Sequence, residues 1–238
     1  MPGRLAIAKL GLIEYERAHA LQQALVAARM HDEIDDTLLL LEHPPVYTLG
    51  RGANEKFIIA RRPEVPVVRV SRGGQVTFHG PGQLVAYPIL KLAGAERDVG
   101  GYLRKLESVM IVALERCGLA AERRDKLTGV WVGPRKIGSI GVGIRRWVTY
   151  HGLALNVNTD LSHFDAIVPC GIADCQMTSI AQLGRIEIQV EKFAETLADS
   201  FREVFGYASA PRIDANDVWG LVEPAEVSAA VSDASEAR

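Results

Sequence analysis

Cys170 has the surroundings that most favour chemistry, because it lies between a rigid proline and a permissive glycine in the segment Pro169-Cys170-Gly171. A loop of this composition can expose sulfur, and an accessible thiolate is a nucleophile. The alternative is a packing role, since cysteine is among the most frequently buried residues. Cys117 fits that alternative, because it falls on the apolar stripe of an expected helix, and Cys175 is also interpreted as structural.

Lys136 is the second candidate, because it begins a run of otherwise small and apolar residues, K-I-G-S-I-G-V-G (136–143). A lysine in such a run either extends its ammonium to water, which is the more common outcome, or lies in a cavity. Beside a thiol, the ammonium favours the thiolate, and the lysine can exchange a proton with the sulfur. Whether Lys136 and Cys170 meet is left open by the sequence.

The segment RGGQVTFHGPGQ (72–83) has the densest concentration of unusual residues, with four glycines, Arg72 and His79 within twelve positions. Closely spaced glycines let the backbone approach a ligand and present its amide donors. The spacing differs from the dinucleotide and phosphate-loop patterns, and the alternative is a glycine-rich hairpin with a surface histidine. His79 can donate to an acyl oxygen, orient a partner or cap a turn, whereas His151 fits a hydrogen-bonded core residue equally well. The remaining histidines have no comparable surroundings: His19, His31, His43 and His163.

Length and composition indicate one catalytic domain, expected over residues 1–222, followed by a flexible tail over 223–238 that is rich in Ala, Ser and Glu. The formal charge of −2 and the absence of a long apolar run argue against binding to nucleic acid or a membrane. Three cysteines without an export signal favour a reducing compartment, so the cytoplasm is expected. The C-x4-C spacing has no matching Cys or His pair, so no metal site is expected.

Hydrophobic spacing predicts the elements that must position these residues. Helices are expected over 14–30, from a cap at Asp98 to Gly118, and over 190–206. Strands are expected in the N-terminal segment, over 37–43, 46–49, 66–70 and 84–90, and in an antiparallel meander from 129 to 158. The interspersed order predicts an α+β fold with a mixed, largely antiparallel sheet flanked by helices.

Four motifs taken together resemble the octanoyltransferases of lipoate biosynthesis: RGGQVTFHGPGQ (72–83), KIGSIGV (136–142), HGLALN (151–156) and PCG (169–171). The resemblance implies a fold similar to the catalytic domain of biotin and lipoate protein ligases. It also implies an enzyme that moves an octanoyl group from octanoyl-acyl carrier protein to a lysine of an acceptor protein. The implied acceptors are the lipoyl domains of the E2 subunits of 2-oxoacid dehydrogenases and the glycine-cleavage H protein.

By the same resemblance, Cys170 is the nucleophile that forms an acyl-thioester, and Lys136 is its acid/base partner. The implied substrate contacts lie in three segments: Arg72, Gly73, Gly74, Gln75, Val76, Thr77, Phe78 and His79; Ser139, Ile140 and Gly141; Gly152, Leu153 and Ala154. No cofactor and no ATP are expected, because the donor thioester is already activated. The main alternative is an ATP-dependent lipoate-protein ligase, which has no need of Cys170, and a third is a non-catalytic protein that binds acyl carrier protein.

Overall fold

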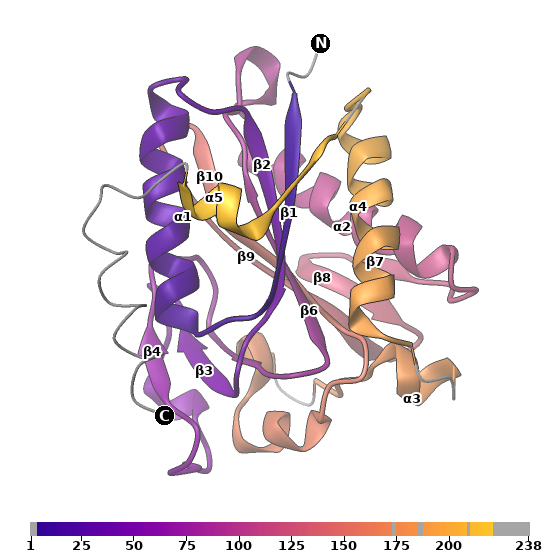
Figure 1. Ribbon diagram of the computed structural model, residues 1–238. Helices are drawn as coiled ribbons and strands as arrows, with labels where there is room; N and C mark the ends of the chain where they lie inside the picture. Colours follow the sequence, from indigo (N-terminus) through magenta and orange to yellow (C-terminus); the bar gives the residue numbers. More distant parts are fainter. Residues whose placement is uncertain (1–3, 173–174, 185–187, 209, 221–238) are drawn as a thin grey trace, which may run out of the picture.

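The computed structural model describes residues 4–172, 175–184, 188–208 and 210–220, and the expected tail over 223–238 lies outside them. Its main sheet follows the strand order β11-β1-β2-β6-β10-β9-β8-β7 (Figure 1). The strands of this sheet are β1 (Leu5–Leu12), β2 (Asp36–Glu42), β6 (Gln83–Ile89), β7 (Glu122–Arg124), β8 (Leu127–Val132), β9 (Arg135–Arg145), β10 (Val148–Asn156) and β11 (Arg212–Ile213).

Strand pairing changes once across this sheet, from parallel at the β11 end to antiparallel from β2 onward. The strand β1 pairs in parallel with β11 and β2, whereas β6 runs antiparallel to both β2 and β10. Strands β10, β9 and β8 continue antiparallel, as the closely spaced glycines and apolar runs of 129–158 predict, and β7 adds a further antiparallel strand. The predicted α+β class with a mixed, largely antiparallel sheet is therefore confirmed.

Helices cover both faces of the main sheet, because its strands alternate two sets of apolar side chains. In β2, Leu38 and Leu40 belong to the core shared with α2 (Val99–Glu115) and α4 (Val190–Phe205). Leu39 and Leu41 belong to the core shared with α1 (Tyr15–Met30), on which α5 (Ala215–Gly220) also packs through Val218. Figure 1 shows α1 to the left of the sheet and α4 to its right.

A second, three-stranded sheet has the order β4-β3-β5 and consists of β3 (Val46–Leu49), β4 (Val67–Arg69) and β5 (Val76–His79). Its core includes Tyr47, Phe78 and Phe164, the last from the 3-10 turn η3 (Leu161–Ala166). The short turn η4 (Pro169–Gly171), which carries Cys170, follows η3 and contacts β5. The small sheet thus brings the glycine-rich segment beside Cys170.

Most elements expected from the sequence form within a residue or two of their expected bounds, and the differences are local. The glycine-rich segment 72–83 contains β5, because Val76, Thr77 and Phe78 form a buried stretch with strand propensity among the glycines. Asp98 occupies the N-cap position of α2 without a capping hydrogen bond, and its carboxylate lies 3.7 Å from Arg104 instead. The short elements β7, β11, α5, α3 (Ile180–Gly184) and the 3-10 turns η1 (Glu55–Phe57) and η2 (Gly94–Glu96) were not expected. No helix in the described part of the chain is long and apolar enough to span a membrane.

Candidate active site

Cys170 lies in a tight turn with an unusual backbone conformation. Its φ is 56° and its ψ is 14°, which is the left-handed region that residues other than glycine rarely adopt. Gly171 follows with φ 69°, and a Cβ at this position would lie 3.0 Å from Gln75 Cγ and 3.1 Å from Phe57 Cε2. The glycine after Cys170 therefore allows the turn to pack closely against the glycine-rich segment.

Lys136 and Cys170, whose contact the sequence left open, are in contact. Lys136 Nζ donates to Cys170 Sγ at 3.3 Å and to the Thr128 carbonyl at 3.0 Å. It also lies 4.9 Å from the centre of the Trp131 ring, a distance at which a cation is attracted to the ring face. Lys136 is only 1% exposed, so these partners rather than bulk water provide its hydrogen bonds.

Strand β9 holds the lysine, and the backbone of Lys136 also forms a parallel bridge with Met177. The Lys136 N–H donates to the Gln176 carbonyl at 2.8 Å, and the Lys136 carbonyl accepts from Thr178 N–H at 2.9 Å. The segment 176–178, which follows the Cys170 turn in sequence, is therefore bound directly to the strand that carries the lysine.

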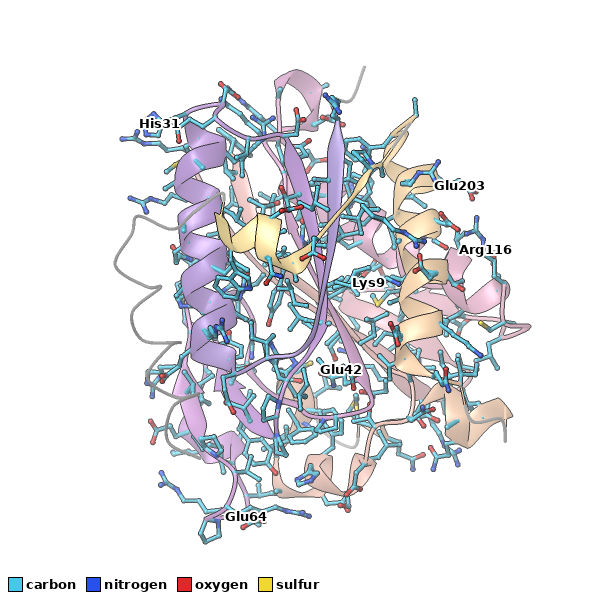
Figure 2. The ribbon with its side chains drawn as sticks, in the orientation of Figure 1. Lys9, His31, Glu42, Glu64, Arg116 and Glu203 are labelled. Carbon is cyan, nitrogen blue, oxygen red and sulfur yellow. The ribbon has the colours of Figure 1, made fainter. Side chains whose placement is uncertain are left out.

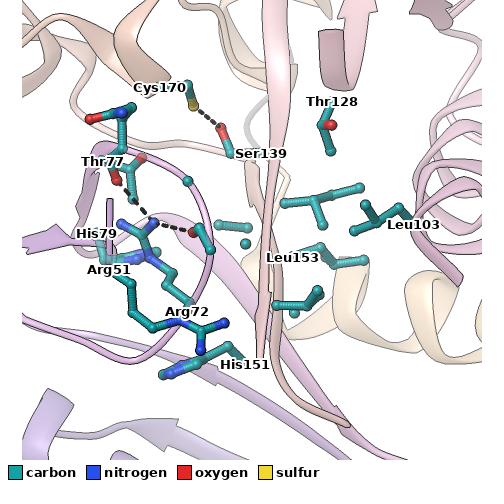
Figure 3. Close-up of a pocket in the computed structure, with 18 of the residues that line it drawn as sticks. Arg51, Arg72, Thr77, His79, Leu103, Thr128, Ser139, His151, Leu153 and Cys170 are labelled. Atoms are coloured by element: carbon teal, nitrogen blue, oxygen red, sulfur yellow. Dashed lines mark hydrogen bonds between the residues drawn. The ribbon is translucent and has the colours of Figure 1, made fainter. Parts of the chain in front are cut away.

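The two other predicted motifs lie opposite each other in the main sheet. Ser139 in β9 pairs with Ala154 in β10, and Gly141 pairs with Gly152. The Ser139 hydroxyl lies 3.9 Å from Cys170 Sγ, as Figure 3 shows with a dashed line. The segments 139–141 and 152–154 therefore form one surface beside the thiol.

A cavity of about 500 Å³ connects these residues, which is within the usual range for a small-molecule site. It is lined by Cys170 and by nearly all the predicted substrate contacts: Arg72, Gly73, Gly74, Gln75, Thr77, His79, Ser139, Ile140, Gly141, Gly152, Leu153 and Ala154. Val76 and Phe78 do not line it, because alternation along β5 turns them into the core of the small sheet.

Arg72 lines the cavity, but its guanidinium is largely committed to the protein. Nη2 donates to the Thr48 carbonyl and to Thr48 Oγ1, each at 2.7 Å. Nη1 donates to the carbonyls of Gly73 and Gln75 at 2.9 and 3.0 Å. The arginine therefore shapes the glycine-rich loop, in addition to any contact with substrate.

Buried aromatic rings form the wall of the cavity on the α1 side. Tyr15, His79, Tyr87 and His151 line the cavity, and His43 lies behind them. The hydroxyl of Tyr87 donates to His43 Nε2 at 2.8 Å, while His43 Nδ1 donates to the Ile13 carbonyl at 2.7 Å. These two hydrogen bonds fix the tautomer of His43 and the position of Tyr87.

The histidines of this wall are uncharged near neutral pH. Burial lowers the pKa of His43 to about 4 and that of His151 to about 3. Burial, with His43 and Arg72 as neighbouring charges, also lowers the pKa of His79 well below its ordinary value. His79 Nδ1 donates to Gln83 Oε1 at 2.7 Å. The wall is thus a neutral aromatic surface, which suits an uncharged ligand chain.

Sequence reasoning missed several of these residues. Tyr15, His43 and Tyr87 were not candidates, because they come from α1, the end of β2 and β6, and only the fold brings them together. Thr128 and Trp131 were missed for the same reason. The signal available for His43 was its position directly after a buried strand, TLLLLEH, where a polar side chain ends an apolar run.

The comparisons with known proteins agree with this geometry. The family model described as the lipoyl protein ligase A/B catalytic domain matches residues 14–202. In structure, the chain is similar to the bipartite lipoate protein ligase of Thermoplasma acidophilum, with a TM-score of 0.66, 16% identity and coverage of 93% of this chain and 91% of the other. The match to this family model and the similar fold together show that the chain is a catalytic domain of the class that contains lipoyl protein ligases and transferases.

Two curated relatives narrow the class. An octanoyltransferase of Thermoanaerobacter sp. (strain X514) is 45% identical over 84% of this chain and 90% of the relative. An octanoyltransferase of Nostoc punctiforme is 49% identical over 82% of this chain and 86% of the relative. The chain belongs to the octanoyltransferase family and is an acyltransferase.

Proposed function

We propose that this enzyme transfers an octanoyl group from octanoyl-acyl carrier protein to a lysine of a lipoyl domain through a thioester on Cys170. The single observation that carries the proposal is the 3.3 Å contact between Lys136 Nζ and Cys170 Sγ beside a cavity of about 500 Å³. A buried amine in contact with a thiol is the arrangement that activates a sulfur nucleophile.

The first half-reaction exchanges one thioester for another. The Cys170 proton passes to a neutral Lys136, and the resulting ammonium stays paired with the thiolate. The thiolate attacks the carrier thioester, the C–S bond to the carrier breaks, and Lys136 returns the proton to the departing carrier thiol. Because thioester replaces thioester, the acyl group remains activated and ATP is not consumed.

The second half-reaction forms an amide. The ε-amine of the acceptor lysine attacks the Cys170 thioester, the C–S bond breaks, and one amine proton reaches the departing sulfur through Lys136. An amide is more stable than a thioester, so this step makes the overall transfer favourable. Ping-pong kinetics follow from the covalent intermediate.

Both half-reactions develop an oxyanion that needs hydrogen-bond donors. The amides of Gly171 and Ile172 already donate to Val168 and Pro169 within the nucleophile turn, each at 3.0 Å. We therefore expect the donors to come from the glycine-rich segment 73–83 rather than from the turn. Each such donor contributes about 3 kcal/mol to stabilising the transition state.

The neutral wall and the paired strands are proposed to hold the octanoyl chain. Tyr15, His79, Tyr87 and His151 present uncharged rings, and Leu153 adds an apolar side chain. Burial of each methylene contributes about 0.8 kcal/mol, so the depth of this part of the cavity would set the preferred chain length.

Intact mass after incubation with octanoyl-acyl carrier protein without ATP tests the proposal. The expected result is the addition of one octanoyl group, absent in Cys170→Ala and retained in Cys117→Ala. Addition of a lipoyl domain or H protein should then discharge the adduct and increase the mass of that acceptor. An ATP-dependent ligase would give no adduct but would modify the acceptor with free octanoate and ATP, and a carrier-binding protein would do neither.

A further inference from the structure

Glu107 is a buried carboxylate on the apolar side of α2, where Leu106 and Met110 also pack into the core. It is 6% exposed. Burying a carboxylate is costly unless hydrogen bonds compensate, so its partners require an explanation. The proposed mechanism uses no residue of this part of α2.

The two oxygens of Glu107 have different partners. Oε2 accepts from Arg123 Nε at 3.0 Å, and the Arg123 side chain is 43% exposed. Oε1 accepts from the backbone N–H of Gly129 at 3.1 Å. The second contact is buried, and it lies on the strand next to the one that carries Lys136.

The Gly129 amide belongs to the same peptide group as the Thr128 carbonyl. That carbonyl accepts from Lys136 Nζ at 3.0 Å. Since a peptide group is planar, its N–H and C=O turn as one unit. Glu107 therefore holds one end of the plane, while the other end is bonded to the lysine. A carboxylate that accepts from the N–H also polarises the carbonyl and strengthens the second hydrogen bond.

Gly129 has the backbone conformation that this arrangement requires. Its φ is 133°, which is accessible to glycine and strained for other residues. A Cβ there would lie 2.7 Å from Lys136 Cε and 3.1 Å from Lys136 Nζ. The Thr128–Gly129 peptide is thus turned toward the lysine, and the hydrogen bond from Gly129 N–H to Glu107 holds it in this orientation.

We propose that Glu107 is a positioning residue for the Lys136–Cys170 pair, acting through the Thr128–Gly129 peptide. The role of the pair itself rests on the proposed function, but the contact that Glu107 maintains does not depend on any acyl substrate. Without the carboxylate, the peptide can rotate, the lysine loses its carbonyl acceptor, and its ammonium is no longer held at the sulfur.

The rate of alkylation of Cys170 by iodoacetamide, followed by peptide mass mapping across a pH series, tests this role. Glu107→Met keeps the volume of the side chain but leaves the Gly129 amide unpaired, and we expect alkylation at neutral pH to fall about tenfold, with its pH profile displaced to higher pH. Glu107→Gln retains an oxygen acceptor and should restore the wild-type profile. Lys136→Met should reproduce the displaced profile of Glu107→Met.

Two ion-pair variants serve as controls. Arg123→Met removes the other partner of Glu107 and should leave the alkylation profile unchanged. Glu203→Met removes an exposed carboxylate that pairs with Arg116 at the far end of α2, on the outer surface in Figure 2, and should also have no effect. A profile for Glu107→Met equal to that of the wild type would refute the proposal, as would an Arg123→Met profile equal to that of Glu107→Met.

Folding and chemistry are separated by further measurements. Thermal melting is recorded for every variant. If Glu107→Met does not melt cooperatively, the alkylation profiles of Glu107→Gln and Arg123→Met are compared with that of the wild type instead. A displaced alkylation profile in either variant would refute the positioning role of Glu107. Because alkylation needs no acyl donor, a wild-type protein that alkylates normally but forms no octanoyl adduct would refute only the proposed function.

Discussion

Gly141 and Gly152 face each other across β9 and β10, as register partners in the middle of the main sheet. The cavity reaches residues of both sheet faces here, since Leu103 of α2 and Tyr15 of α1 both line it. Figure 3 shows Leu103 and Arg72 on opposite sides of the strand. Because neither of these paired positions has a side chain, residues from both faces of the sheet can approach the same cavity.

Space at Gly152 leads to the first prediction. A Cβ at this position would lie 2.3 Å from the Ala86 carbonyl oxygen and 2.6 Å from Pro88 Cδ, and neither the backbone nor the proline ring can move away easily. We expect Gly152→Ala to lower the free energy of unfolding by about 1–3 kcal/mol and to reduce octanoyl transfer. Denaturant melts check this value against Gly52→Ala, where a Cβ meets nothing within 4 Å. Equal midpoints for the two variants would contradict the prediction.

Replacement of Lys136 tests its acid/base role. Lys136→Met should slow formation of the octanoyl adduct by about 100-fold, because the thiol loses its proton acceptor. Lys136→Arg should not restore the rate, since a guanidinium does not give up its proton near neutral pH. Rapid-quench mass measurements give the rates, and Lys105→Met, on the partly exposed side of α2, is the matched control. A wild-type rate in Lys136→Met would exclude the lysine from proton transfer.

The buried histidines predict a loss of stability in acid. Their pKa values in the folded protein lie below the unfolded value of 6.5, at about 4 for His43 and about 3 for His151. Between pH 6.5 and these values the unfolded chain binds more protons, so stability is complete above 6.5 and falls as the pH decreases. Each histidine adds about 1.4 kcal/mol per pH unit to the slope.

Denaturant melts over this pH range test the histidine prediction. His151→Asn, chosen because asparagine tolerates the positive φ of 54° at this position, should give a shallower slope than the wild type. His31→Asn is the control, because His31 lies at the exposed end of α1 (Figure 2). Identical slopes for His151→Asn and the wild type would show that His151 does not take up a proton on unfolding.

The main role predicted for Arg72 is to hold the conformation of the glycine-rich loop. Arg72→Lys keeps the charge but cannot reach Thr48 and the Gly73 and Gln75 carbonyls together, so it should lower the free energy of unfolding by about 2–3 kcal/mol. Arg69→Lys, at an exposed position, should have little effect. If Arg72→Lys melts like the wild type while transfer falls, Arg72 acts on the substrate and not on the loop.

Much of the scaffold was predictable from short-range pattern. The apolar spacing of α2 and α4 and the glycine-interrupted strands of 129–158 gave elements close to those observed. The strand β5 was missed because glycines on both sides obscured a stretch of only four residues. Short elements such as β7 and β11 owe their form to strand partners distant in sequence, so local pattern carries little signal for them.

The site divides in the same way. Cys170, Lys136 and the glycine-rich segment have unusual local sequence, and this makes them candidates without knowledge of the fold. Glu107 carried a weaker signal, a carboxylate on an apolar helix stripe beside Leu106 and Met110, and it was not recognised. Thr128 acts through its backbone carbonyl, and no feature of its side chain could have revealed that contact.

The left-handed backbone conformation of Cys170 lowers the stability of the fold at the residue proposed to carry the reaction. A side chain at φ 56° costs about 1–2 kcal/mol that glycine would avoid, so Cys170→Gly should melt at a higher temperature than the wild type while losing the proposed nucleophile. Selection for thermal stability alone would therefore favour an inactive enzyme. With the proposed role of its thiol, Cys170 would hold a reactive group in a strained turn at the expense of stability, a trade-off that is common at functional sites.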